Sequence, residues 1–211
     1  MKILYLSCHS ILEFDEISLL TELGHEVFSL GAYSNPSTVG LRPAIPNMKF
    51  NPELYNISIQ CSKENIHPDL VNWADVVILM HNAKMPGQES EQPWLAGNWS
   101  TLKNKRTIWR SIGQSLPRVE QELDFYKNQG LQIIRYSSKE RTIPSYCGED
   151  TIIRFYKDPE EYKDWNGKKL RIINFTQSLQ TRGDHCGYRV FMSATDGFKR
   201  KVYGPGNDDC R

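Results

Sequence analysis

Polar residues or a glycine follow three predicted strands, at points where ligand-binding residues gather in parallel sheets. They are His9 after residues 1–7, His81 with Asn82 after residues 76–80, and Gly113 with Gln114 after residues 106–112. Because the carboxyl ends of parallel strands meet at one edge, we expect His9, His81, Gly113 and Gln114 to lie close together. Imidazole and carboxamide groups can hydrogen-bond a polar substrate, and a glycine lets backbone approach it closely. The structural alternatives are a capping or loop histidine and a simple turn glycine.

Arg182 is a second candidate, in the C-terminal part of the chain. It lies in the polar turn 176–183, which follows the apolar run 170–175. A guanidinium in such a turn can hold a diphosphate through charge-assisted hydrogen bonds. The structural alternative is a solvent-exposed loop arginine.

Several signatures of cofactor binding and catalysis are missing from the sequence. It has no Gly-x-Gly-x-x-Gly, no Gly-x-x-x-x-Gly-Lys-Ser/Thr and no Gly-x-Ser-x-Gly. Two Cys/His pairs, Cys8–His9 and His185–Cys186, are adjacent in sequence, and neighbours on a strand point to opposite faces. No second pair at metal-ligand spacing completes either of them. We therefore expect neither a cofactor nor a metal, and no catalytic nucleophile is identified.

Charge and composition narrow the possible partners. The net charge of +1, from 26 basic and 25 acidic residues, provides no field for a nucleic-acid backbone, so no nucleic acid is expected. The five cysteines include no Cys-x-x-Cys pair, which favours a reducing compartment and a cytoplasmic protein. No apolar stretch approaches the ~20 residues of a membrane span, so we expect no transmembrane segment.

Apolar runs alternate with segments of helical spacing, which predicts an α/β fold. The expected architecture is a doubly wound, mainly parallel, Rossmann-like sheet. The strands are predicted at 1–7, 25–30, 76–80, 106–112, 131–136 and 151–155, the helices at 11–23, 68–75 and 117–128, and long loops at 32–56 and 81–100.

The same pattern predicts the domain organisation. Residues 1–156 form the first Rossmann-like domain, and the charged segment 157–169 reads as a linker. A new α/β pattern begins at residue 170, with strands expected at 170–175 and 201–203. Residues 170–211 are therefore interpreted as the beginning of a second Rossmann-like unit.

The order and spacing of six segments resemble the retaining nucleotide-sugar glycosyltransferases built from two Rossmann-like domains, the GT-B architecture. The turn 176–183 matches in length the Gly-Arg-Leu-x-x-x-Lys-Gly turn of that family, with Gln177 for the Arg, Arg182 for the Lys, and Gly183 retained. Ile112 departs from the family, which often has a histidine there. The six segments are 1–7, Leu19–Phe28, Asp69–Asn82, Thr107–Gln114, 176–183 and Val202–Gly206.

The resemblance implies transfer of a sugar from a nucleoside-diphosphate sugar to a carbohydrate or other glycan acceptor, without a metal. It assigns acceptor binding to the first domain and donor binding to the second. The family's donor site also uses two glutamates that lie beyond the last residue of this chain, so weak donor binding is expected. The residues concerned are His9, His81, Gly113 and Gln114 for the acceptor, and Gln177, Arg182 and Gly183 for the donor.

Two other function classes remain open. A non-catalytic Rossmann-like domain could bind a nucleotide or a carbohydrate without turnover. A nucleotide-dependent oxidoreductase or epimerase would share the fold, but the missing glycine fingerprint disfavours it.

Overall fold

The computed structural model contains two units, Met1–Asp158 and Pro159–Arg211, and each is considered by itself. The division falls within the predicted linker 157–169, which lies outside the described residues. Backbone alone is described for Ile11 and His185. The described residues are 1–35, 44–45, 47–82, 87, 89–113, 115–156, 172–175, 178–203 and 207.

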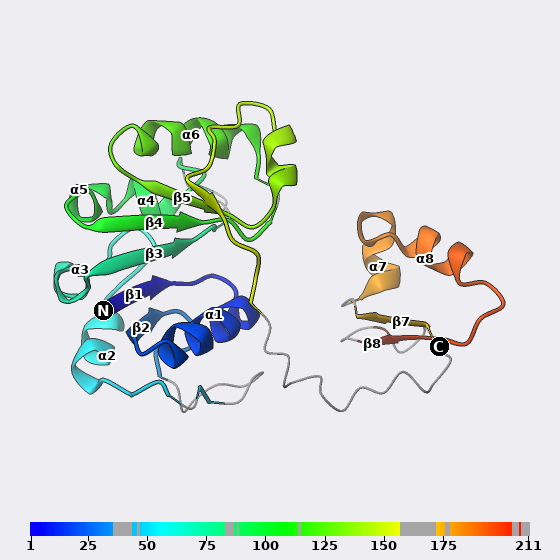
Figure 1. Cartoon of the computed structure of the whole chain (residues 1–211), viewed down its shortest axis with the longest axis horizontal. Helices are drawn as coiled ribbons and strands as arrows, with labels where there is room; N and C mark the ends of the chain where they lie inside the picture. The colour runs from blue at the N-terminus through cyan, green and yellow to red at the C-terminus, as the bar shows by residue number, and fades with distance from the viewer. Residues whose placement is uncertain are drawn as a thin grey trace. The chain divides into compact units, whose positions relative to one another are not determined.

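The first unit is an α/β structure around a six-stranded sheet in which every pair of neighbouring strands is parallel. The order is β2-β1-β3-β4-β5-β6, and Figure 1 shows β5, β4, β3, β1 and β2 stacked from top to bottom. The predicted fold class is confirmed. The strands are β1 (Lys2–Leu6), β2 (Glu26–Leu30), β3 (Val76–Met80), β4 (Arg106–Arg110), β5 (Gln132–Arg135) and β6 (Thr151–Ile152).

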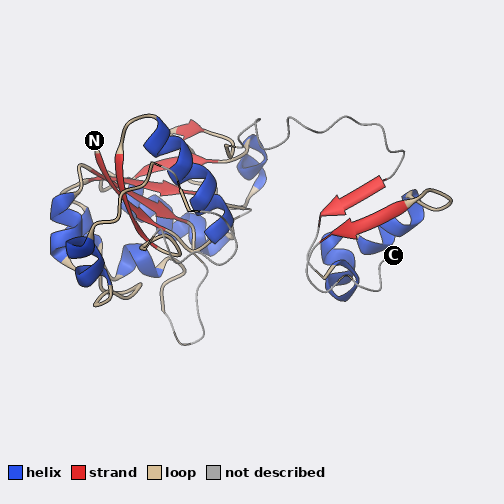
Figure 2. Ribbon diagram, turned by 90° about the horizontal axis from the view of Figure 1, so that it is seen from below, coloured by secondary structure: helices blue, strands red, loops and turns tan. Residues whose placement is uncertain are grey.

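Helices cover both faces of this sheet, as Figure 2 shows. Alternate residues of β1 supply the two cores: Ile3 and Tyr5 pack with α1, while Leu4 and Leu6 pack with the other helices. A parallel sheet buried on both faces accounts for the nearly continuous apolar sequences of its central strands β1 and β3. The helices are α1 (Ser10–Glu22), α2 (Pro52–Ser58), α3 (Pro68–Trp73), α4 (Pro93–Ala96), α5 (Trp99–Leu102), α6 (Pro117–Lys127) and the 3₁₀ helix η1 (Ser138–Thr142).

The segments predicted as long loops contain three short helices. Within 32–56, α2 begins at Pro52, and the Asn51 side chain caps it by accepting from the Leu54 N–H at 3.1 Å. Within 81–100, α4 begins at Pro93 and α5 at Trp99. Proline at the first helical position and asparagine as a cap both favour helix starts, so these residues were not only loop formers.

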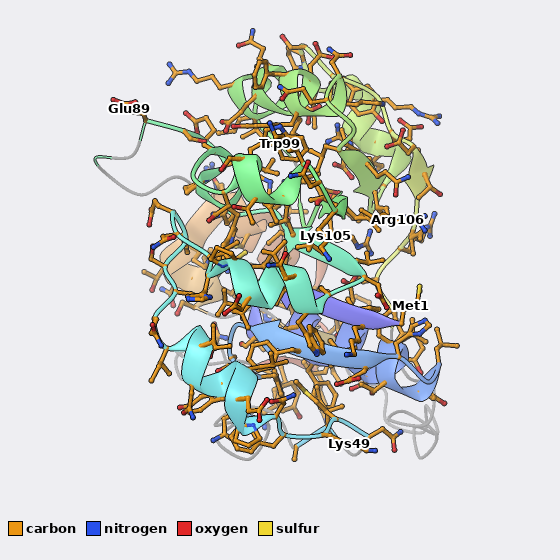
Figure 3. All side chains as sticks on the ribbon, turned by 90° about the vertical axis from the view of Figure 1, so that its left-hand side faces the viewer. Met1, Lys49, Glu89, Trp99, Lys105 and Arg106 are labelled. Atoms are coloured by element: carbon orange, nitrogen blue, oxygen red, sulfur yellow. The ribbon has the colours of Figure 1, made fainter. Side chains whose placement is uncertain are left out.

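The amino edge of the sheet is held by structural contacts. Lys105, just before β4, donates from Nζ to the carbonyl oxygens of Asn72 and Ala74 at 3.1 and 2.9 Å, at the C-terminal end of α3. Met1, Lys105 and Arg106, labelled in Figure 3, lie where β1 and β4 begin. Trp99, labelled in the same figure, packs edge-on against Tyr126 of α6, with ring centroids 5.0 Å apart.

The second unit is a small βαβ arrangement. β7 (Ile172–Phe175) and β8 (Arg200–Tyr203) are parallel neighbours, and they lie where strands were predicted, at 170–175 and 201–203. α7 (Leu179–Arg182), the 3₁₀ helix η3 (Gly183–Cys186) and α8 (Tyr188–Ala194) lie between them in the chain. Leu179 and Val202 form the small core on one face.

Gly97 offers a test of the packing around α4 and α5. A Cβ there would lie 2.3 Å from the Glu64 backbone oxygen, so backbone must shift to admit it. We expect Gly97→Ala to cost about 1–3 kcal/mol, the usual range for overpacking. Each kcal/mol lowers Tm by about 2–4 °C in a domain of this size. The matched control is Gly113→Ala, because a Cβ on Gly113 meets nothing within 4 Å. Equal Tm values for the two variants would contradict the close contact.

Candidate functional site at the carboxyl edge

The strand order places a topological switch point between β1 and β3. The chain goes from β1 to β2 on one side, and then to β3 on the opposite side of β1. Connections leave the sheet in opposite directions at such a point, and ligands of open parallel sheets bind there, beyond the carboxyl ends of the strands. The predicted residues His9 and His81 follow these two strands.

His81 connects the ends of three strands. Its backbone N–H donates to the Arg110 carbonyl oxygen at the end of β4, at 2.7 Å. Its own carbonyl oxygen accepts from the thiol of Cys8, which follows β1. The ring packs edge-on against Trp109, with centroids 5.5 Å apart. His81 therefore lies at the carboxyl edge, as predicted, between the residues that follow β1 and those that follow β4.

Burial favours the neutral form of the His81 imidazole. Loss of solvent is the largest influence on its pKa and lowers it; Glu120 opposes this, and Arg135 adds to the lowering. The Nδ1 atom is buried and has no hydrogen-bond partner in the described part of the chain. A neutral ring of this kind can donate or accept one hydrogen bond at that atom.

His9 is a capping histidine, which is the structural alternative that the sequence left open for it. Its Nδ1 accepts from the Leu12 N–H at 3.4 Å and so caps α1. Its backbone N–H donates to Ser7 Oγ at 3.1 Å. The side chain is exposed at the carboxyl edge, so capping and ligand contact are compatible.

Gly113 follows β4 by three residues and lies at the same edge. Its φ is not positive and no atom would obstruct a side chain, so neither the turn nor packing requires glycine. Gln114, the fourth predicted residue, lies outside the described residues.

Gln92 is a residue that the sequence did not single out. Its Nε2 donates to the Asn82 carbonyl oxygen at 2.8 Å, and its Oε1 accepts from the Asn82 N–H at 3.4 Å. The same Oε1 accepts from Trp109 Nε1 at 3.0 Å. One buried carboxamide thus fixes the backbone that follows His81 and the ring against which His81 packs.

A buried ion cluster lies behind this edge. Arg135 of β5 donates to both carboxylate oxygens of Glu120 at 2.7 Å and to Glu140 at 3.4 Å, and the Arg135 and Glu120 side chains are 0% exposed. The guanidinium also lies over the Trp109 and Tyr146 rings, at 5.3 and 4.8 Å. Burial alone raises the pKa of Glu120, but hydrogen bonds and charge from Arg135 outweigh it and lower that pKa.

Glu140 links this cluster to the turn after β4. Ser111 Oγ donates to Glu140 at 2.8 Å and accepts from the Tyr136 N–H at 2.9 Å. The turns that follow β4 and β5 are thereby joined two residues before Gly113.

The first turns of the two helices at this edge already contain carboxylates. Glu13 of α1 is buried and accepts from Ser29 Oγ, the Ala32 N–H and the Tyr33 N–H at 2.5, 3.0 and 2.8 Å. Glu120 holds the corresponding place in α6. Phosphate groups bind at helix starts because the free N–H groups and the dipole attract anions. Two buried carboxylates there make this edge a poor phosphate site.

Of the donor-side residues, Arg182 and Gly183 are described and Gln177 is not. Arg182 is exposed at the end of α7, as the loop-arginine alternative also requires. Gly183 has φ +53°, in the left-handed region that favours glycine. The nearby Arg189 is already paired with Asp184.

In the described part of the chain, no three His, Cys, Asp or Glu side chains gather where they could hold a metal ion. Of the helices described, none combines the length and apolar character that crossing a membrane demands. No protein-family model, curated protein or solved structure matches the chain.

The pKa of His81 can be measured directly by NMR titration of the ring nitrogens. We expect it below the ordinary value of about 6.5, because burial penalises the imidazolium. A measured pKa at or above that value would mean that the His81 ring is solvated. The interpretation of this edge as uncharged would then lose its support.

Glu120→Gln tests the ion cluster. We expect it to lower the free energy of unfolding by about 3–5 kcal/mol, because it leaves buried Arg135 incompletely paired. The native fold lowers the pKa of Glu120, so its contribution is full above the ordinary glutamate pKa of about 4.3. This stabilising contribution is lost as the pH falls through the lowered pKa of Glu120. The difference in free energy of unfolding between wild type and variant should therefore narrow in acid. Denaturant unfolding at neutral and acid pH measures this difference.

The control is Glu22→Gln at the exposed end of α1, which should change the free energy of unfolding little. A gap that widens in acid would contradict the assignment.

Proposed function

We propose that the chain is a metal-independent glycosyltransferase that transfers a sugar from a nucleoside-diphosphate sugar to a glycan acceptor. The observation that carries the proposal is the pair of parallel α/β units in one chain. The first has a polar edge at its switch point, and the second begins a new parallel sheet with an arginine in its βα segment. This arrangement supports the GT-B resemblance, with acceptor and donor on different units.

The chemistry of the first edge supports an acceptor there. His9, His81, Gly113 and Gln114 are the proposed contacts. Glu13 and Glu120 occupy the helix starts where an oxidoreductase would hold its dinucleotide phosphates. An uncharged, hydroxyl-rich acceptor fits this environment better than a nucleotide does.

The donor is assigned to the second unit, through Gln177, Arg182 and Gly183. In the transfer, the anomeric carbon exchanges its bond to the diphosphate oxygen for a bond to an acceptor hydroxyl oxygen, and the hydroxyl proton passes to the leaving diphosphate or to water. The Arg182 guanidinium would stabilise the charge that develops on the leaving diphosphate. No residue is assigned to proton transfer.

A reducing, cytoplasmic location belongs to the same proposal. The four described cysteines are free: Cys8, Cys61, Cys147 and Cys186. Burial, followed by the charge of Glu120, raises the pKa of Cys147 to about 12, so this thiol is unreactive.

A non-catalytic carbohydrate-binding protein is the second candidate. It is favoured by the same edge, where the unpartnered Nδ1 of His81 offers a polar atom to a bound sugar. Sugar transfer to any acceptor separates the two candidates.

Arg182→Ala tests the donor assignment. Wild-type protein should bind uridine, guanosine or adenosine diphosphate, or one of their sugars, in a calorimetric titration. A hydrogen bond to a charged group contributes about 1.5–3 kcal/mol, so the variant should bind at least several-fold more weakly. The control is Arg189→Ala, which removes an arginine already paired with Asp184. Unchanged affinity in Arg182→Ala, or equal losses in both variants, would place the donor site elsewhere.

A further inference from the structure

Asn82 is a buried polar residue with no use inside the fold. Its side chain is 1% exposed, and neither amide atom has a hydrogen-bond partner among the described residues. A buried donor or acceptor left unpaired is costly, so an asparagine with both amide atoms unpaired calls for a partner beyond the described residues. The backbone of Asn82 is held on both sides by Gln92, so the residue is fixed in place although its amide is not engaged.

Asn98 shows how a structural asparagine behaves in the same unit. Its Oδ1 accepts from the Ile66 N–H at 2.6 Å, and its Nδ2 donates to the carbonyl oxygens of Lys63 and Trp94, both at 2.9 Å. It is 4% exposed, so the two asparagines are similarly buried. The difference between them is that, among the described residues, Asn98 has partners for both of its amide atoms and Asn82 has none.

The surroundings of Asn82 indicate what kind of group its amide would meet. It directly follows His81, whose buried Nδ1 is also unpartnered among the described residues. The charged groups that act on His81 are Glu120 and Arg135, which pair with each other. With Glu140 also bound to Arg135, the cluster contains two carboxylates and one cation, which disfavours an anionic ligand.

We propose that Asn82 is a binding residue of the acceptor site, and that its amide recognises a hydroxyl group of an uncharged sugar. A carboxamide offers both a donor and an acceptor, and a hydroxyl group can satisfy either. The neighbouring Nδ1 of His81 provides a second polar atom for the same molecule. This inference rests on the proposed function, in which the first unit holds the acceptor.

The test uses the full chain and four probes: glucose, mannose, N-acetylglucosamine and, as the charged comparison, glucose 6-phosphate. At least one neutral sugar should give saturable NMR shifts of the His81 and Asn82 amides, with glucose 6-phosphate weaker. Asn82→Leu and the isosteric Asn82→Asp should each weaken that sugar at least fivefold, since one lost hydrogen bond is worth about 1 kcal/mol.

Stability provides the matched control. Asn82→Leu should leave Tm unchanged or raise it, because it removes an unpaired buried amide. Asn98→Leu should lower Tm, because it breaks three hydrogen bonds. A lower Tm or failure to fold in Asn82→Leu would assign the amide a structural role and overturn the inference. Absence of neutral-sugar shifts, or equal sugar affinity in wild type and variants, would also overturn it.

The outcomes also separate this inference from the proposed function. Nucleotide binding that depends on Arg182, without any effect of Asn82, would leave the glycosyltransferase proposal standing and remove the sugar contact. Sugar binding that depends on Asn82, without any nucleotide binding, would do the reverse and favour the carbohydrate-binding alternative.

Discussion

The buried cation of Arg135 is the constraint on which the carboxyl edge of the sheet depends. A guanidinium that is 0% exposed must be paired, and the partners come from two other elements, Glu120 of α6 and Glu140 of η1. The pairing fixes where α6 begins relative to β5. Through Glu140 and Ser111 it also joins the turn after β4 to the turn after β5.

This cluster also determines the electrostatics of the site. Because it contains one more carboxylate than cations, it disfavours phosphate, and the buried carboxylate of Glu13 in the first turn of α1 acts in the same direction. The candidate contacts at the edge are polar groups without a formal charge: the imidazole of His81, whose neutral form burial favours, the Asn82 amide and the backbone at Gly113. The fold is common to many activities, so the proposed sugar acceptor would be recognised by this local chemistry and not by the sheet itself.

Much of the fold could be predicted from the sequence, because β1 and β3 are the apolar runs that a buried parallel sheet requires, and β2, β4 and β5 are short segments that each hold buried apolar residues. The last, β6, is paired only over Thr151–Ile152, shorter than the predicted 151–155. The helices α2, α4 and α5 were missed because proline and asparagine serve both loops and helix starts, and each helix is short.

The positions of the candidate site residues were predictable in part. Strand ends placed His9, His81 and Gly113 at one edge, because that placement follows from parallel pairing alone. The roles of Gln92, Glu120 and Arg135 could not be predicted, because each depends on partners brought together by sheet register, such as Trp109 beside Ile133. Periodicity identifies the buried face of an element, but not which buried polar groups will meet.

The most direct test of the account is NMR mapping of two ligands, added separately to the isotope-labelled chain. The account predicts that a nucleoside diphosphate shifts amides around Arg182 and Gly183 in the second unit. It predicts that a neutral sugar shifts amides around His9, His81 and Gly113 in the first. Nucleotide-induced shifts at the β1–α1 turn, Ser7 to Leu12, would contradict it and indicate a nucleotide-binding first unit instead.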